Sequence, residues 1–201
     1  MRTRFVRFAL TIAAASVAAA VGINAQDDTR KLFESGQFQK VVEQTPDDAP
    51  ADAQYLKGLA QLRLGQNDGA KAAFARLPAG GDAWRSVGDS AVALIDGNQD
   101  GALEAARAAV AADASLPAAQ YQLGLALEAR GENPAAAEAF ATAAEANPQM
   151  AYAHYNAGMN YYKAKRIDRM AVYFENFLKL APNAPEKPAV ESIMRTVRGR
   201  Q

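Results

Sequence analysis

The chain lacks cysteine and has little histidine. None of its 201 residues is a cysteine, and His154 is the only histidine. Disulfides, thiolate metal sites and cysteine nucleophiles are therefore excluded. A single histidine without cysteine cannot form a zinc site of the His/Cys kind, and the sequence suggests no serine–histidine–acid arrangement or phosphate-binding glycine loop. We therefore predict no metal, no cofactor and no catalytic residues, and we expect a protein that is not an enzyme.

The chain also lacks an excess of charge of either sign. It has 22 basic and 22 acidic side chains, which give a formal net charge of zero. A nucleic-acid-binding domain normally carries a clustered basic surface, so we predict no nucleic-acid partner. Aromatic residues make up only 8% of the chain, and much of its 50% hydrophobic content is alanine. Alanine is the best helix former, and this composition favours closely packed helices over a β-sandwich.

The longest apolar run lies at the start of the chain. Three arginines within the first seven residues precede the apolar stretch 8–23, and Ala25 stands just before a polar segment. This is the pattern of a secretory signal peptide over residues 1–25. We predict cleavage after Ala25, with Ala20 as an alternative, and export to the periplasm or another extracytoplasmic compartment.

The alternative to cleavage is an uncleaved leader that anchors the protein in a membrane. The apolar run is short for a spanning helix, and its alanines contribute little hydrophobicity. No second apolar run of spanning length follows it. After leader cleavage we therefore expect no stable membrane insertion.

Glycine, phenylalanine and proline recur at a fixed spacing. Gly124 and Gly158 are 34 residues apart, and so are the pairs Phe140–Phe174 and Pro148–Pro182. Such a period is typical of a repeated helix pair. The pattern resembles the tetratricopeptide repeat (TPR), which implies an all-α fold. The expected architecture is an α-solenoid, a right-handed superhelix of antiparallel helix pairs, in an exported bacterial TPR protein.

The resemblance divides the chain into consecutive units. After the leader we predict a degenerate N-terminal repeat over 26–50, four TPR-like repeats over 51–82, 83–116, 117–150 and 151–184, and a C-terminal capping helix and tail over 185–201. Three positions depart from the pattern: Ser90 stands where a helix glycine is expected, Ala114 where a proline is expected, and Lys165 replaces the glycine of a turn.

Three glycines fall in the middle of predicted helices: Gly58, Gly124 and Gly158. Glycine costs about 1 kcal/mol relative to alanine there, which is tolerable where a partner helix crosses closely. We expect alanines to supply the small residues that face these glycines: Ala70, Ala102 and Ala136. The recurring phenylalanines are expected to fill the space between one helix pair and the next.

The TPR resemblance implies that the first helix of each pair lines a concave groove, where a protein or peptide partner binds. Tyr55 would lie on this wall. Aromatic side chains with a polar tip are favoured in binding surfaces. The candidate partner-binding residues are Trp84, Tyr121, Tyr152, Tyr155, Asn156, Met159, Tyr162 and Lys163. The alternative is that several of these aromatic side chains simply pack between helices.

Two further features limit the kind of recognition. Some TPR domains hold a C-terminal carboxylate with lysine and asparagine side chains, but here Asn156, Asn160 and Lys163 have no counterparts in the preceding repeats. We therefore predict no carboxylate clamp. His154 occupies a position often filled by tryptophan, which favours a packing role. The leading hypothesis is a protein-interaction scaffold of the cell envelope, and the alternative is a structural or assembly subunit of an envelope complex.

Overall fold

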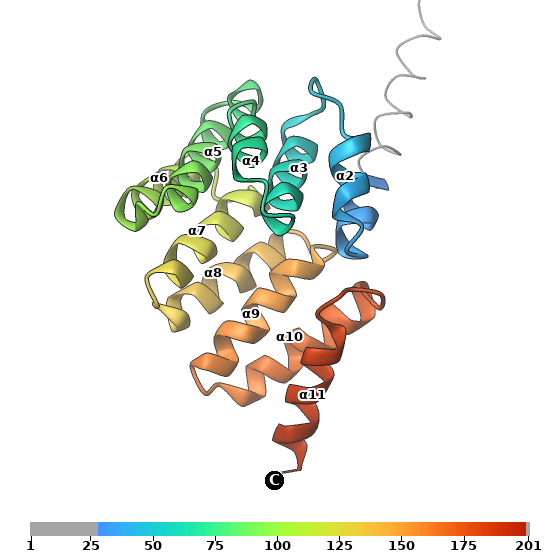
Figure 1. The fold of residues 1–201 in the computed structure, drawn as a ribbon. Helices are drawn as coiled ribbons and strands as arrows, with labels where there is room; N and C mark the ends of the chain where they lie inside the picture. Colours follow the sequence, from blue (N-terminus) through green and yellow to red (C-terminus); the bar gives the residue numbers. More distant parts are fainter. Residues whose placement is uncertain (1–27, 200–201) are drawn as a thin grey trace, which may run out of the picture.

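The computed structural model describes residues 28–199. The predicted leader and its cleavage site lie outside these residues. Between residues 28 and 199 the regular structure is helical throughout, without a strand. Figure 1 shows the helices as antiparallel pairs that follow one another along a superhelix. The predicted all-α solenoid is therefore confirmed.

The helices follow one another with short connections. A first helix over residues 28–34 precedes α2 (Phe38–Gln44). Four pairs follow: α3 (Ala51–Arg63) with α4 (Asn67–Phe74), α5 (Asp82–Ile95) with α6 (Gln99–Ala112), α7 (Pro117–Ala129) with α8 (Asn133–Ala146), and α9 (Ala151–Lys163) with α10 (Ile167–Leu180). A short 3₁₀ helix, η1 (Leu77–Gly80), links α4 to α5, and α11 (Lys187–Arg198) ends the described chain.

The turn inside each pair is closed by a left-handed residue. Gly65, Gly97 and Gly131 take φ values of 72°, 76° and 76°. Glycine reaches this region without the steric penalty of a Cβ atom and commonly ends a helix. Lys165 adopts φ 58° at the equivalent turn between α9 and α10. The turn therefore keeps its geometry without glycine, although a side chain disfavours this conformation.

The mid-helix glycines make room for phenylalanine rings rather than for alanines. A Cβ atom on Gly124 would lie 2.6 Å from the Phe140 ring. The same pairing recurs between Gly58 and Phe74 and between Gly158 and Phe174. The expected alanines are not the nearest neighbours of these glycines. Each phenylalanine lies over the glycine of its own helix pair, because an aromatic ring needs the space that a missing side chain leaves.

The repeat over 83–116 lacks both the mid-helix glycine and the phenylalanine at these positions, so the two positions change together. Ser90 replaces the glycine of α5, and Ala106 stands where the other repeats carry phenylalanine. Both residues are fully buried. The Ser90 hydroxyl donates a hydrogen bond to the Ala102 carbonyl, 2.8 Å away. A small residue on the second helix thus permits a side chain on the first.

The last helix covers the end of the solenoid. Val190 and Met194, one turn apart on α11, are buried, and α11 packs on α10. The apolar face of α11 is therefore directed toward the preceding repeat, as a capping helix requires. Along residues 28–199 there is no helix that combines the length and the apolar character needed to cross a membrane.

Candidate functional site

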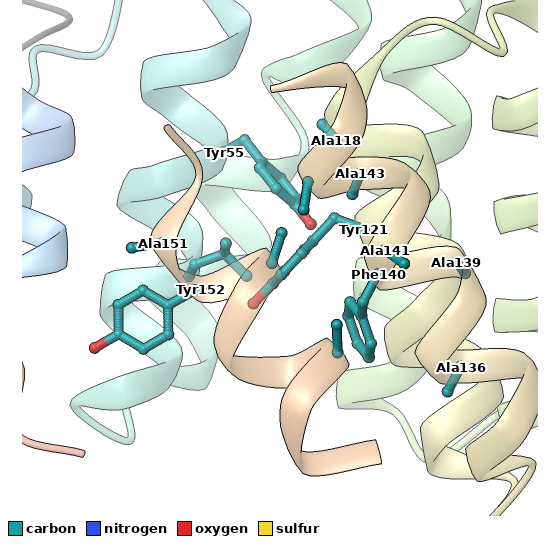
Figure 2. Packing of buried hydrophobic residues seen from close by; sticks show 14 of the residues in the cluster. Tyr55, Ala118, Tyr121, Ala136, Ala139, Phe140, Ala141, Ala143, Ala151 and Tyr152 are labelled. Atoms are coloured by element: carbon teal, nitrogen blue, oxygen red, sulfur yellow. The ribbon is translucent and has the colours of Figure 1, made fainter. Parts of the chain in front are cut away.

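The concave side of the solenoid is filled by tyrosine side chains. Tyr55 on α3, Tyr121 on α7 and Tyr152 on α9 are only 2%, 4% and 3% exposed. Figure 2 shows Tyr55 and Tyr121 approaching one another, with Phe140 packed against Tyr121 at a ring separation of 5.2 Å. These three tyrosines are therefore packed inside the superhelix rather than exposed on an open wall.

A buried chain of hydrogen bonds holds this tight curvature. The Tyr55 hydroxyl donates to the side-chain oxygen of Gln122 at 2.9 Å, so α3 contacts α7 directly across the intervening repeat. The Gln122 amide in turn donates to the Ser90 hydroxyl at 3.3 Å. Burial raises the pKa of Tyr55 well above its ordinary value, which keeps its hydroxyl a donor. Three successive repeats are therefore joined through polar groups that have no access to water.

The N-terminal unit contacts the C-terminal part of the chain. The rings of Phe33 and Tyr152 lie 5.2 Å apart in an edge-on arrangement. A Cβ atom on Gly36 would come within 2.8 Å of the Pro185 ring. Figure 1 shows the connection between α10 and α11 next to α2. The solenoid thus curls until its first unit touches its last.

Charged and polar groups strengthen this closure. The Arg63 guanidinium donates to the Glu186 carboxylate at 2.6 Å and lies over the Tyr152 ring, 4.9 Å from its centre. The Tyr152 hydroxyl donates to the other Glu186 oxygen at 2.8 Å. Burial, followed by this hydrogen bond to a carboxylate, raises the pKa of Tyr152. We call Arg63, Tyr152 and Glu186 the closure triad.

The closed superhelix leaves a chamber of about 350 Å³ at the end where the first helices of the repeats begin. We call it the axial chamber. Its wall comes from the helix 28–34, from α3, α5, α7 and α9, and from the connections before α7 and α9. The aromatic side chains of the wall are Phe33, Tyr55, Trp84, Tyr121 and Tyr152. Ligand pockets typically have volumes of about 300–1,000 Å³ and mostly apolar walls, so this chamber falls at the small end of the range.

Three charged side chains also line the axial chamber: Arg30, Glu34 and Asp52. Burial raises the pKa of Glu34 to about 7, against smaller opposing effects of the nearby Arg30 charge and of a hydrogen bond from the Ala151 backbone. A carboxyl group with this pKa changes its charge near neutral pH.

The predicted binding residues fall into separate places. Trp84, Tyr121 and Tyr152 line the axial chamber, although the two tyrosines are nearly buried. At the far end of α9, Tyr162 is 39% exposed and Lys163 is exposed, with its ammonium group 2.6 Å from Glu128. These two ends of the predicted set do not form one surface.

The remaining predicted residues lie on α9 and do not line the chamber. Asn156 is buried and its amide donates to the Tyr121 hydroxyl at 2.8 Å. Tyr155 is half-buried against Phe177, with ring centres 5.2 Å apart, and Met159 is partly buried on the same helix. Their roles in partner binding stay predictions.

Sequence reasoning left several chamber residues out of the candidate set. Phe33, Glu34 and Arg30 belong to the degenerate first unit, far in sequence from the α9 residues that they approach. Asp52 lies in the first turn of α3. No local spacing marks these four residues as neighbours of Tyr152. The sequence did indicate Tyr55, because it occupies the same position in its repeat as Tyr121 and Tyr155.

His154 packs inside the structure. It is 7% exposed, its Nε2 atom lies 3.2 Å from the Pro148 carbonyl, and its ring is tilted against Tyr173. Burial lowers the pKa of His154. Among residues 28–199, no group of three or more histidine, cysteine, aspartate or glutamate side chains is placed to hold a metal ion.

Comparison with known proteins agrees with this architecture. Residues 121–185 and 52–79 match two sequence models that are both described as tetratricopeptide repeat. None of the curated proteins compared with the chain matches it.

Solved structures show similar folds at low identity. The chain is similar to a crystal structure of YrrB, described as a TPR protein with an unusual peptide-binding site. The two are 19% identical, with a TM-score of 0.52 over 89% of this chain and 88% of that one. A crystal structure of MamA is 20% identical, with a TM-score of 0.48 over 71% of this chain and 84% of that one.

The fold and the repeated glycine–phenylalanine packing define an α-solenoid built from helix pairs of one kind. With both sequence matches falling on these pairs, the chain is a tetratricopeptide-repeat protein. Proteins of this family are generally interaction modules that hold a protein or peptide partner.

Proposed function

We propose that this protein is a scaffold of the cell envelope that binds a polypeptide partner on its concave side, at the axial chamber. The observation that carries the proposal is the chamber itself. Five aromatic rings from five helices line one cavity at the end of the TPR superhelix where the first helices of the repeats begin. Aromatic side chains around a concave site are typical of anchor points for a partner's side chain.

The envelope location rests on the leader pattern over residues 1–25. It is tested by recovering the protein from fractionated cells and measuring its mass. A chain that begins at Gln26 in the extracytoplasmic fraction supports the location. A full-length chain in the cytoplasm contradicts it.

A structural subunit that is permanently packed in a complex is the weaker candidate. Such a subunit would expose a large apolar surface when isolated. Among the described residues the large hydrophobic side chains exposed to solvent are only Leu64, Tyr162 and Val172. These positions come from α9, α10 and the end of α3, and they lie apart in the sequence.

Site-specific crosslinking tests the binding surface. A photoreactive amino acid at Asp52, which is exposed and lines the chamber, should capture the partner in cells. The matched control is the same amino acid at Val172, which is 57% exposed on α10 and lies outside the chamber. Capture of the same protein at Asp52 and not at Val172 supports concave binding. Capture only at Val172 contradicts it.

A further inference from the structure

We infer that the axial chamber is an aromatic cage for a cationic side chain, so that the partner contributes a lysine or arginine residue. This inference rests on the proposed function and specifies the part of the partner that enters the chamber. It goes beyond concave binding in general, because it fixes the charge and the shape of the group that is recognised.

The arrangement of the rings is the first observation. Phe33 meets Tyr152 at 5.2 Å, and Tyr55 meets Trp84 at 6.0 Å, both in edge-on arrangements. Tyr121 adds a fifth ring to the same cavity. The face of an aromatic ring carries partial negative charge and attracts a cation within about 6 Å of its centre. The Arg63 guanidinium already lies over the Tyr152 ring, 4.9 Å from its centre, so the other rings of the cavity are the ones that favour a further positive group with an apolar stem.

The charges at the chamber are the second observation. The wall contains the carboxyl groups of Glu34 and Asp52 and the single guanidinium of Arg30. With Glu34 ionised, acid side chains outnumber basic ones. An anionic ligand would meet two carboxylates and the negative faces of the rings.

The size of the chamber is the third observation. A volume of about 350 Å³ suits one long side chain with a few water molecules and is too small for a folded segment. Lysine and arginine carry a charged head on an aliphatic stem, and the stem can pack along apolar walls. The apolar side chains of Leu56 and Leu59 lie beside the rings and would contact such a stem.

Calorimetric titration of the purified protein with short peptides tests this inference. The probe is a blocked pentapeptide with one central lysine among alanines, and the control replaces lysine with norleucine, which keeps the stem without the charge. We expect the norleucine peptide to bind at least about tenfold more weakly. Equal binding of the two peptides overturns the inference. Butylammonium tests the source of the cation: binding as tight as that of the lysine peptide overturns the assignment to a polypeptide.

Two variants show whether the binding occurs in the chamber. Glu34→Gln keeps the shape of the side chain and removes its charge, and it should weaken lysine-peptide binding about threefold to tenfold. The matched control is Glu43→Gln on α2, an exposed carboxylate bonded to Gln39 at 2.9 Å that does not line the chamber. It should leave binding unchanged. Equal effects of the two variants, or none of Glu34→Gln, overturn the inference.

The pH dependence of binding gives an independent readout. A bound cation stabilises ionised Glu34, so binding should be several-fold tighter at about pH 8 than at about pH 6. The other titratable or charged groups of the wall are Arg30, Asp52 and the three tyrosines. The difference should disappear in Glu34→Gln, and its persistence there would contradict the role of Glu34.

The outcomes separate this inference from the proposed function. A partner captured through Asp52, together with lysine and norleucine peptides that bind equally, overturns the cage and leaves the scaffold function standing. Selective lysine-peptide binding without any partner captured in cells overturns the scaffold function, and the inference about the partner falls with it.

Discussion

Replacing Gly124 with alanine should destabilise the protein, although alanine is the better helix former. Alanine in the middle of α7 would by itself stabilise the helix by about 1 kcal/mol. The added Cβ atom would lie 2.6 Å from two atoms of the Phe140 ring, which is fully buried. Overpacking of this kind costs about 1–3 kcal/mol. We expect a net loss of about 1 kcal/mol.

The cause can be isolated with a double-mutant cycle. Phe140→Ala alone should cost about 3–5 kcal/mol because it opens a cavity. In that background Gly124→Ala should stabilise the protein, by about 1 kcal/mol, since the ring is no longer there. The two substitutions should therefore couple by about 2 kcal/mol, measured from urea denaturation midpoints and slopes.

Gly69→Ala on α4 is the matched control. Its Cβ atom would meet only the end of the flexible Gln61 side chain, so helix propensity should dominate and the protein should be unchanged or more stable. The reasoning is refuted if Gly124→Ala stabilises the wild-type protein. It is also refuted if the effect is the same with and without Phe140.

Four further substitutions test separate parts of the structure. Lys165→Gly should raise the free energy of unfolding by about 1 kcal/mol, measured by urea denaturation, because it removes a side chain from a left-handed position. Gly36→Ala and Gly65→Ala both place a side chain at positive φ, but only the Cβ atom at position 36 also meets Pro185. If the N-terminal unit contacts the C-terminal part of the chain, Gly36→Ala should therefore lower the melting temperature more than Gly65→Ala does. Because folding raises the pKa of Glu34, the free energy of unfolding should fall as pH rises from about 4.5 to about 7. Glu34→Gln should remove about 1–2 kcal/mol of that fall, after allowance for solvent screening. Denaturation measured as a function of pH checks this. An unchanged pH profile in Glu34→Gln would contradict the burial of this carboxyl.

The repeat and its helices were predictable because they depend on local spacing. Glycine, phenylalanine and proline recur within the helix pairs. The helices that they end or separate are neighbours in the chain, so a short stretch of sequence indicates each pair. The packing of a phenylalanine ring over each mid-helix glycine was not predicted, although the signal was present. Gly58 and Gly124 each precede a phenylalanine by sixteen residues, whereas Ser90 precedes an alanine by the same interval. Comparing the two positions of each pair from repeat to repeat would have predicted that the phenylalanine ring packs on the glycine.

The axial chamber could not be predicted in this way. The approach of Phe33 to Tyr152 depends on the curvature of the whole solenoid, which accumulates from a small rotation at each repeat. Phe33 and Tyr152 are 119 positions apart, so no local spacing in the sequence indicates the accumulated rotation between them. The same limit applies to the candidate site: Trp84 and Tyr121 were identified from their place in the repeat, whereas Glu34 was not, because it enters the chamber only through the closure.

The fluorescence of Trp84 tests the central claim most directly, namely that a polypeptide partner binds in the axial chamber. Trp84 is the only tryptophan of the chain and it lines the chamber, so its emission reports on that cavity. Titration with a tryptophan-free segment of the crosslinked partner should change the emission saturably, with the same affinity that calorimetry gives. Binding by calorimetry without any change in Trp84 emission would place the partner elsewhere and contradict the account.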